Sequence, residues 1–246
     1  MKLCDDVYLV ASGSLGFDWT HPSDCNVYAV ETGEGIVLID SGTGLSTEDI
    51  LKHLGAYGFR PEEITHIFLT HLHADHSGGA AALKRITGAK IVVLEQAAGV
   101  LELGCEEAIE LPRAREAGFY PKDYRWEACQ ADVKIQDRDS MRIGKYQFRA
   151  FHTPGHSAFD TCFYLTGQHS AMLFSGDTVM YGGKISMLNT ADFSLGQLAA
   201  SMETLSRLEV TRLFPGHGQP ALNRGSQHIG KAHRIFSSMG VPPSIA

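Results

Sequence analysis

The chain has 246 residues, of which 43% are hydrophobic and 20% are charged, an ordinary composition for a globular protein. The formal net charge is −7 and the basic residues are scattered, which argues against nucleic acid as a main partner because phosphate binding needs a concentrated Lys/Arg surface. No stretch approaches the ~20 apolar residues of a membrane span, and the N-terminus lacks the apolar segment of a signal peptide.

The five cysteines are widely spaced, odd in number and form no Cys-x-x-Cys pair. This pattern is neither a disulfide framework nor a thiolate zinc site. Free thiols fit a reducing compartment, so we expect a cytoplasmic protein without a membrane segment.

The first part of the chain alternates short apolar runs with turns, which is typical of strands and short helices. In chain order the patterns predict strands over 7–10, 26–30 and 35–40, a helix beginning at Ser46, a strand over 64–70, a helix capped by Ser77 and ending at about Ile86, and a strand over 90–94.

Residues 95–137 differ in composition, with acidic residues followed by an aromatic patch that includes Tyr120, Tyr124 and Trp126. We predict a mainly helical insertion here. A packed surface layer is the favoured interpretation; a lid or a homodimer contact that adds apolar walls to a site is the alternative.

Strands and helices alternate again in the second half of the chain. The patterns predict strands over 141–151, 161–166, 171–174 and 211–214, and helices over 194–208 and 226–239. The fold class is therefore α+β, and we expect residues 1–246 to form a single domain with two packed sheets and helices outside. The histidines that we expect to be surface or helix residues are His53, His169, His228 and His233.

The most informative motif is Thr-His-Leu-His-Ala-Asp-His-Ser-Gly-Gly at 70–79, directly after an apolar run. It places His71, His73, Asp75 and His76 within six residues. Neutral imidazole nitrogens and carboxylate oxygens are ligands for zinc and similar ions. Because unpaired polar groups are costly to bury, this cluster indicates a metal site.

Three further candidates lie downstream, each after an apolar run and next to Gly or Pro: His156, Asp177 and His217. This is the pattern of a functional side chain on a loop at the end of a strand.

Five imidazoles and two carboxylates exceed the four ligands of one tetrahedral zinc. They suit two divalent ions that share one carboxylate, most simply zinc, with manganese or iron as alternatives. Two such ions can hold a hydroxide between them and polarise a carbonyl oxygen, so the reaction expected is hydrolysis.

These motifs, in this order over most of the chain, resemble the metallo-β-lactamase-fold hydrolases. The resemblance implies a four-layer αβ/βα sandwich of two mixed β-sheets flanked by helices. It assigns His71, His73 and His156 to one metal and Asp75, His76 and His217 to the other. Asp177 would bridge the two ions, and Asp40 would orient a ligand imidazole through its second ring nitrogen. Asp75 and Asp177 are thereby the candidate catalytic carboxylates.

Within the family, the segment Ser-Gly-Asp-Thr-Val-Met-Tyr-Gly-Gly around Asp177 is similar to glyoxalase II, a thioesterase. The chain after His217 has no room for the C-terminal helical domain with which that enzyme holds glutathione, so glutathione recognition is left open. The expected substrate is a small ester, thioester or lactone.

A lactonase of the same fold is the nearest alternative, because it also uses a bridging Asp and an aromatic hydroxyl near the substrate. Tyr181 is the candidate for that hydroxyl. Candidate substrate contacts, each with an ordinary packing or surface role as its alternative, are Trp19, Tyr120, Tyr124 and Lys184.

Two alternatives come from other classes. One is a mononuclear iron persulfide dioxygenase, which the full set of second-metal ligands disfavours. The other is a nuclease of the ribonuclease Z type, which the acidic charge disfavours.

Overall fold

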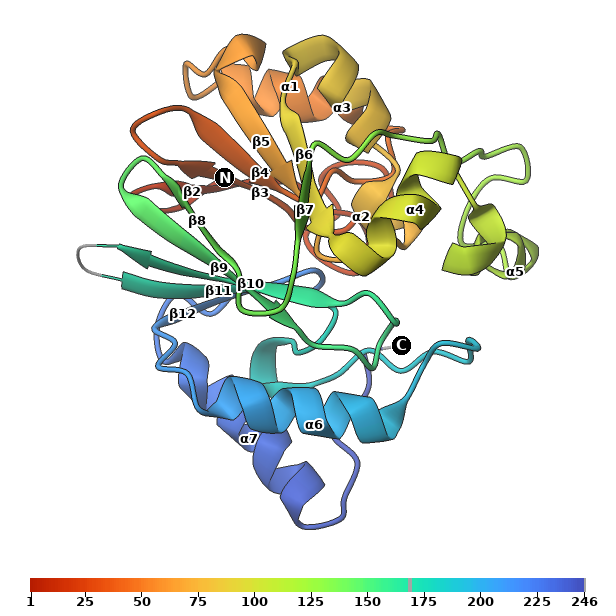
Figure 1. Cartoon of the computed structure of the whole chain (residues 1–246), viewed down its shortest axis with the longest axis vertical. Helices are drawn as coiled ribbons and strands as arrows, with labels where there is room; N and C mark the ends of the chain where they lie inside the picture. Colours follow the sequence, from red (N-terminus) through yellow and green to blue (C-terminus); the bar gives the residue numbers. More distant parts are fainter. Residues whose placement is uncertain (168–169, 246) are drawn as a thin grey trace. The chain divides into compact units, whose positions relative to one another are not determined.

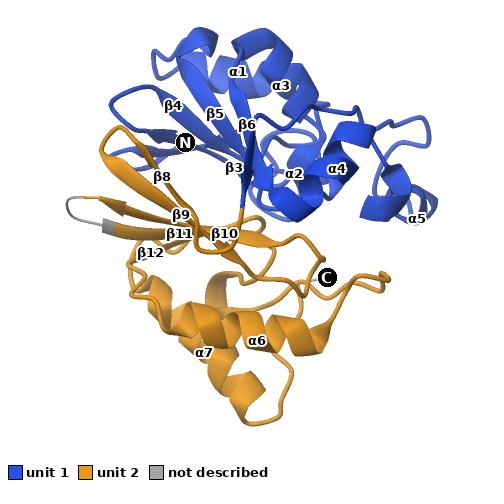
Figure 2. Ribbon diagram, viewed as in Figure 1, with its two compact units in different colours: residues 1–135 blue, residues 136–246 orange. Residues whose placement is uncertain are grey.

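The computed structural model describes residues 1–167 and 170–245, and His169 lies outside the described residues. The chain divides into two compact units, Met1–Ile135 (unit 1) and Gln136–Ala246 (unit 2), coloured separately in Figure 2. Each unit is built around its own mixed β-sheet (Figure 1). Among the described residues, no helix is both long enough and apolar enough to cross a bilayer.

The sheet of unit 1 has seven strands in sequence order. They are β1 (Lys2–Cys4), β2 (Val7–Ala11), β3 (Val27–Glu31), β4 (Ile36–Ile39), β5 (Ile64–Phe68), β6 (Lys90–Leu94) and β7 (Val133–Ile135). The first four strands are antiparallel, and β4 to β7 run parallel. Parallel strands need crossover connections. Helices provide the connection from β4 to β5 and the connection from β5 to β6.

The helices of unit 1 follow β4, β5 and β6 in the sequence. They are α1 (Thr47–Gly55), α2 (Ala74–Ser77), α3 (Ala80–Thr87), α4 (Glu95–Leu103) and α5 (Leu111–Glu116), with 3₁₀ turns η1 (Pro61–Glu63) and η2 (Glu106–Ile109). In α1, Ile50 and Leu54 are buried four residues apart, as expected for one helical face. α1 contacts β2, whereas α3 contacts β5 and β6.

The sheet of unit 2 has five strands in the order β12-β11-β10-β9-β8. Their bounds are β8 (Ser140–Ile143), β9 (Tyr146–His152), β10 (Thr161–Gly167), β11 (Ser170–Gly176) and β12 (Arg212–Pro215). Only the β11–β12 pair is parallel among these pairings.

The helices α6 (Leu195–Ser206) and α7 (Gly225–Ser237) flank this second sheet (Figure 1), and the short turn η3 (Tyr181–Gly183) packs on α7. A cluster of fully buried side chains joins them, among them Leu173 and Leu213 of the strands and Leu198, Met202 and Ile229 of the helices. Two mixed sheets flanked by helices are the fold class that the sequence predicts.

Most predicted elements agree with the structure to within a few residues, and the strand predicted over 90–94 coincides with β6. The run predicted as one strand over 141–151 is a hairpin, β8 and β9, because the chain turns at Gly144, where φ is +53°. The predicted cap at Ser77 is wrong: Ser77 ends α2, and α3 begins after Gly79. Its hydroxyl instead donates to the Leu72 and His73 carbonyls.

The segment 95–137 contains α4, η2 and α5, followed by an irregular stretch and then β7. Its helical part is confirmed up to Glu116. The strand β7 was not predicted, and its pairing with β6 makes the segment part of the first sheet. The division into two compact units does not decide whether the chain is a single domain, which stays a prediction.

Candidate metal centre

In unit 1 the candidate ligands follow β5: His71 and His73 lie in a loop, and Asp75 and His76 lie in the short helix α2. We refer to residues 71–77 as the ligand loop. The parallel strands β4 and β5 end at the same edge of the sheet, so Asp40 and Thr70 meet there. One oxygen of the Asp40 carboxylate accepts from the backbone N–H of Thr70 at 2.8 Å, and the Thr70 hydroxyl lies 2.9 Å from the other oxygen. Asp40 has φ +63°, a left-handed conformation that Asp tolerates better than most residues. The strand end thus fixes the start of the ligand loop.

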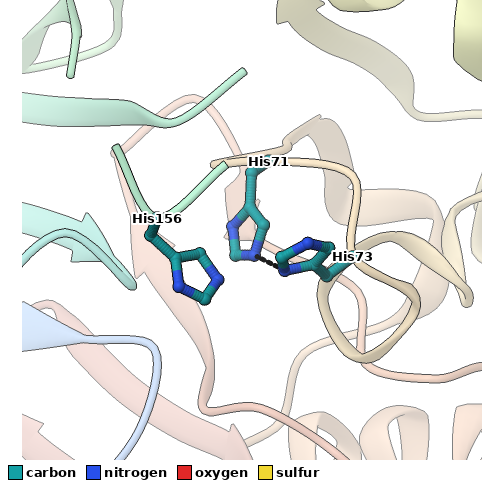
Figure 3. A group of neighbouring side chains, drawn as sticks. All are labelled: His71, His73 and His156. Atoms are coloured by element: carbon teal, nitrogen blue, oxygen red, sulfur yellow. Dashed lines mark hydrogen bonds between the residues drawn. The ribbon is translucent and has the colours of Figure 1, made fainter. Parts of the chain in front are cut away.

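The rings of His71 and His73 converge on one point. Nε2 of His71 lies 3.1 Å from Nδ1 of His73, as the dashed line in Figure 3 marks; the figure also draws the ring of His156, from unit 2. Two nitrogens bound to one tetrahedral zinc at 2.0–2.1 Å would be about 3.3–3.4 Å apart. The two rings therefore already have the spacing of two ligands to one ion.

His76 faces carboxylates through both ring nitrogens. Nδ1 lies 2.8 Å from Oδ2 of Asp40, and Nε2 lies 3.5 Å from Oδ2 of Asp75. A carboxylate only accepts hydrogen bonds when ionised, so Nδ1 donates to Asp40, and Nε2 is the nitrogen on the side of Asp75. A hydrogen bond to the second ring nitrogen is the arrangement that fixes the tautomer of a metal-binding imidazole.

In unit 2 the candidate ligands follow β9, β11 and β12. These three strands run in the same direction, since β9 and β11 are both antiparallel to β10 and β12 is parallel to β11. His156, Asp177 and His217 therefore lie at one edge of the sheet. Gly155 precedes His156 with φ +144°, and a Cβ there would lie 2.4 Å from the backbone nitrogen of Leu198, so only glycine fits this tight turn.

One carboxylate oxygen is shared by two imidazoles in this unit. Oδ2 of Asp177 lies 3.5 Å from Nε2 of His156 and 3.5 Å from Nε2 of His217. Nδ1 of His156 lies 3.1 Å from the backbone carbonyl of Ser186, so that nitrogen is the donor and Nε2 is again the nitrogen with the lone pair. A carboxylate oxygen placed between ring nitrogens of two histidines has the geometry of a bridging ligand.

The donor set fits divalent metal ions. It consists of imidazole nitrogens and carboxylate oxygens, and most of these side chains are buried: His71, His76, His156, Asp177 and His217. Burial of so many polar groups is costly unless a ligand satisfies them. The carbonyl and carboxylate partners of the second ring nitrogens complete the arrangement that metal-binding histidines require.

A model of the metallo-beta-lactamase superfamily matches residues 21–217, a range that includes every one of these candidate ligands. The chain belongs to this superfamily. The relatives that support membership are hydrolases by name, and the chain is accordingly a hydrolase of the metallo-β-lactamase fold.

Among its relatives, the acyl-coenzyme A thioesterase MBLAC2 of Homo sapiens is 30% identical over 223 residues, which cover 84% of this chain and 79% of the relative. The Bos taurus protein of that name is 29% identical over 225 residues with the same coverage. An atrochrysone carboxyl ACP thioesterase of Aspergillus fumigatus is 30% identical and covers 78% of this chain and 50% of its own length.

Solved structures of metallo-β-lactamases share the fold. The subclass B3 enzyme BJP-1 of Bradyrhizobium japonicum superimposes with a TM-score of 0.73 over 97% of this chain and 91% of its own, at 23% identity. A β-lactamase of Chitinophaga pinensis gives 0.75 over 97% and 91%, at 20% identity. At such low identity the likeness concerns the fold alone.

In unit 1 the hydroxyls of the two tyrosines predicted as substrate contacts form hydrogen bonds with other residues of the chain. The Tyr120 hydroxyl donates to Oδ1 of Asp75 at 3.0 Å. The Tyr124 hydroxyl donates to the Thr43 carbonyl at 2.8 Å and is buried. Burial and the neighbouring Asp75 carboxylate raise the pKa of Tyr120 well above its usual value, so its phenol stays protonated. Both hydroxyls are thus committed to positions around the ligand loop.

The other residues predicted to contact the substrate have exposed side chains. Trp19 stacks on His53 with ring centroids 4.1 Å apart, and its indole is partly exposed. Tyr181, at the start of η3, lies against the His228 ring at 4.3 Å and is also partly exposed. Lys184 follows η3 with an exposed side chain. The substrate roles of these three residues stay predictions.

Two groups that act on the candidate ligands were not predicted. Thr70 connects Asp40 with the ligand loop. The sequence feature that could have identified it is its position directly before His71. The Ser186 carbonyl holds His156, but a backbone oxygen leaves no signature in the sequence.

Proposed function

We propose that this chain is a dinuclear metal-dependent hydrolase of thioesters. The observation that carries the metal-dependent hydrolysis is the Asp177 carboxylate oxygen, which lies 3.5 Å from ring nitrogens of both His156 and His217. The thioester class rests on the relatives named as acyl-coenzyme A and ACP thioesterases.

In this proposal the candidate ligands bind a pair of divalent ions. His71, His73 and His156 would bind one ion, and Asp75, His76 and His217 the other, with Asp177 between them. Zinc suits these nitrogen and oxygen donors, and manganese or iron would also suit them. The convergence of His71 and His73 at 3.1 Å, together with the shared oxygen of Asp177, supports this assignment.

When bound, the ions would supply a hydroxide at neutral pH and polarise the substrate carbonyl. The chain supplies the geometry. Asp40 and the Ser186 carbonyl accept from Nδ1 of His76 and His156, so that Nε2 of each ring is the nitrogen that would face an ion. In the overall reaction water adds to the thioester carbonyl carbon, the carbon–sulfur bond breaks, and the thiol and the carboxylate leave.

Tyr181 is the proposed aromatic hydroxyl for the reacting carbonyl oxygen. Its backbone neighbour Gly182 donates to Nδ1 of His228 at 2.8 Å, and the Tyr181 ring lies against that same histidine. The segment is therefore anchored on α7 while the ring remains partly exposed. Lys184 and Trp19 stay candidate contacts for a substrate carboxylate and for an apolar acyl group, respectively.

We propose a small-molecule substrate, no nucleic-acid partner and a cytoplasmic location; the five cysteines are all free thiols, which agrees with a reducing compartment. Formation of a homodimer stays a prediction.

The first experiment counts metals and compares substrates. We expect close to two zinc or manganese ions per purified chain by plasma mass spectrometry. We also expect release of free thiol from acyl-coenzyme A at a rate above that of lactone opening. Faster hydrolysis of acyl lactones would replace the thioesterase by a lactonase. A single iron per chain with oxygen consumption would replace both by a persulfide dioxygenase.

A further inference from the structure

Residues 119–126 form an irregular segment that follows α5, and we refer to it as the strap. Three aromatic side chains of the strap carry polar groups that point into unit 1: Tyr120, Tyr124 and Trp126. Tyr124 and Trp126 are almost fully buried. Buried aromatic hydroxyls and indoles need hydrogen-bond partners, and the identity of those partners shows what the strap holds.

All three partners lie on or beside the ligand loop. The Tyr120 hydroxyl donates to Oδ1 of Asp75 at 3.0 Å and accepts from the Asp75 backbone N–H at 3.2 Å. The indole of Trp126 donates to the Ser77 hydroxyl at 2.9 Å. Ser77 in turn donates to the Leu72 carbonyl at 2.8 Å. The strap therefore contacts the loop both at a ligand carboxylate and at its backbone.

Tyr124 makes the third contact, on the neighbouring turn after β4. Its hydroxyl donates to the Thr43 carbonyl at 2.8 Å. A Cβ at Gly78 would lie 2.2 Å from that hydroxyl oxygen, so a side chain at this position would displace the ring. Gly78 thus has a packing role for the strap in addition to its place between α2 and α3.

The strap is braced from behind by an ion pair. Arg115 and Glu106 lie 2.6 Å apart and are both largely shielded from solvent. Arg115 also donates to the Tyr124 carbonyl at 2.7 Å, and Glu106 accepts from the Trp126 backbone N–H at 3.0 Å. Each partner of the ion pair therefore holds the strap backbone, which limits its freedom to move as a lid.

We propose that the strap presets the metal-binding carboxylate, with Tyr120 as the positioning residue. Tyr120 donates to Oδ1 of Asp75, whereas Oδ2 lies 3.5 Å from Nε2 of His76 and is the oxygen that the proposal assigns to the ion. Because the same hydroxyl also accepts from the Asp75 N–H, both the carboxylate and the backbone of this ligand are fixed by one group. The inference rests on the proposed function, since it takes Asp75 as a ligand.

The test compares Tyr120→Phe with Tyr124→Phe. The two rings are stacked with centroids 5.2 Å apart, and each variant loses one hydrogen-bonded hydroxyl, but of the two tyrosines it is Tyr120 that contacts a candidate ligand. We would measure the dissociation constant of each zinc ion by competition with a chromophoric chelator. Loss of a partner that orients a ligand typically weakens metal binding by about 10–100-fold. We expect that weakening for one ion in Tyr120→Phe and less than about threefold in Tyr124→Phe.

Cobalt substitution supplies a second readout. The visible absorption of bound cobalt reports ligand geometry, so Tyr120→Phe should change the spectrum and Tyr124→Phe should leave it as in the wild type. Equal zinc affinities and identical cobalt spectra in both variants would overturn the proposal.

The result distinguishes this inference from the proposed function. The role of the strap is rejected, and the proposed function kept, if the wild type binds two ions and hydrolyses thioesters while Tyr120→Phe binds zinc as tightly as the wild type. The proposed function is rejected, and the role of the strap kept, if only Tyr120→Phe binds zinc more weakly and the wild type does not hydrolyse thioesters.

Discussion

Oδ2 of Asp40 lies 2.8 Å from Nδ1 of His76, and both side chains are buried. The carboxylate is held in turn by the backbone N–H and the hydroxyl of Thr70. Asp40 therefore sets which ring nitrogen of His76 carries the proton, although it offers no atom to a metal in the proposed assignment.

Asp40→Asn should weaken binding of one metal ion by about 10–100-fold, the usual effect of losing a partner that orients a ligand. With the asparagine carbonyl on the Thr70 N–H, its amide group would face Nδ1 of His76. That nitrogen must then accept, and the proton moves to Nε2, where it blocks the metal. Asparagine tolerates the positive φ at this position, so the fold should persist. Chelator competition measures the affinity, and an unchanged value with intact circular dichroism would contradict the assignment.

Asp177→Ala should lower metal content from two ions to one per chain. It should also reduce thioester turnover by more than about 100-fold, beyond the range typical of residues that only orient a ligand. The reason is the oxygen that Asp177 shares between His156 and His217. Glu203→Ala is the matched control, because it removes an exposed carboxylate of the same unit whose pair with Arg207 contributes little. Near-wild-type turnover with two ions in Asp177→Ala would remove the bridge from the proposal.

Asp160 should make the metal-free protein less stable as the pH rises from about 4 to about 6. Burial raises its pKa from 3.8 to about 6, despite hydrogen bonds from the N–H and the hydroxyl of Ser157. In this interval the folded chain keeps a proton that the unfolded chain has released, so increasing pH favours unfolding. The shift corresponds to on the order of 3 kcal/mol.

Urea unfolding of metal-free protein at about pH 4.5 and about pH 7 tests this sign. Other groups titrate in the same interval, so the informative quantity is the difference between wild type and Asp160→Asn. The variant should lack the part of the pH dependence that destabilises the wild type at the higher pH. Parallel pH dependence in the two proteins would show that Asp160 is ionised in both states.

The sequence was sufficient to predict most of the strands and the segments after them that carry the candidate ligands, because those signals are local. An apolar run bounded by turn residues predicted β6 without error, and the His-rich motif directly after β5 gave the ligand loop of unit 1. The contact between Asp40 and Thr70 was not predicted, although parallel strands bring their carboxyl ends to one edge of a sheet.

The contacts that adjust the ligands could not be predicted in the same way. Tyr120 is 45 residues from Asp75 in sequence, and nothing between them has a periodic pattern that would bring them together. Ser77 was misassigned as a helix cap for a related reason. Its hydroxyl donates to the Leu72 and His73 carbonyls and accepts from the indole of Trp126, which is 49 residues away in sequence. The local sequence pattern does not show that distant partner.

Removal of the metal should destabilise the protein, because a ligand that binds only the folded state shifts unfolding by mass action. At a free zinc concentration about 100 times the dissociation constant, the stabilisation is about 2.7 kcal/mol. For a chain of 246 residues this corresponds to a melting temperature lower by about 5–10 °C after chelation. Zinc or manganese should restore the original value. Magnesium should not, since it prefers oxygen ligands in octahedral geometry and the buried donors here are mostly imidazoles. A melting temperature that is unaffected by chelation, with the metal shown to be gone, would mean that the buried histidines are satisfied by the protein alone.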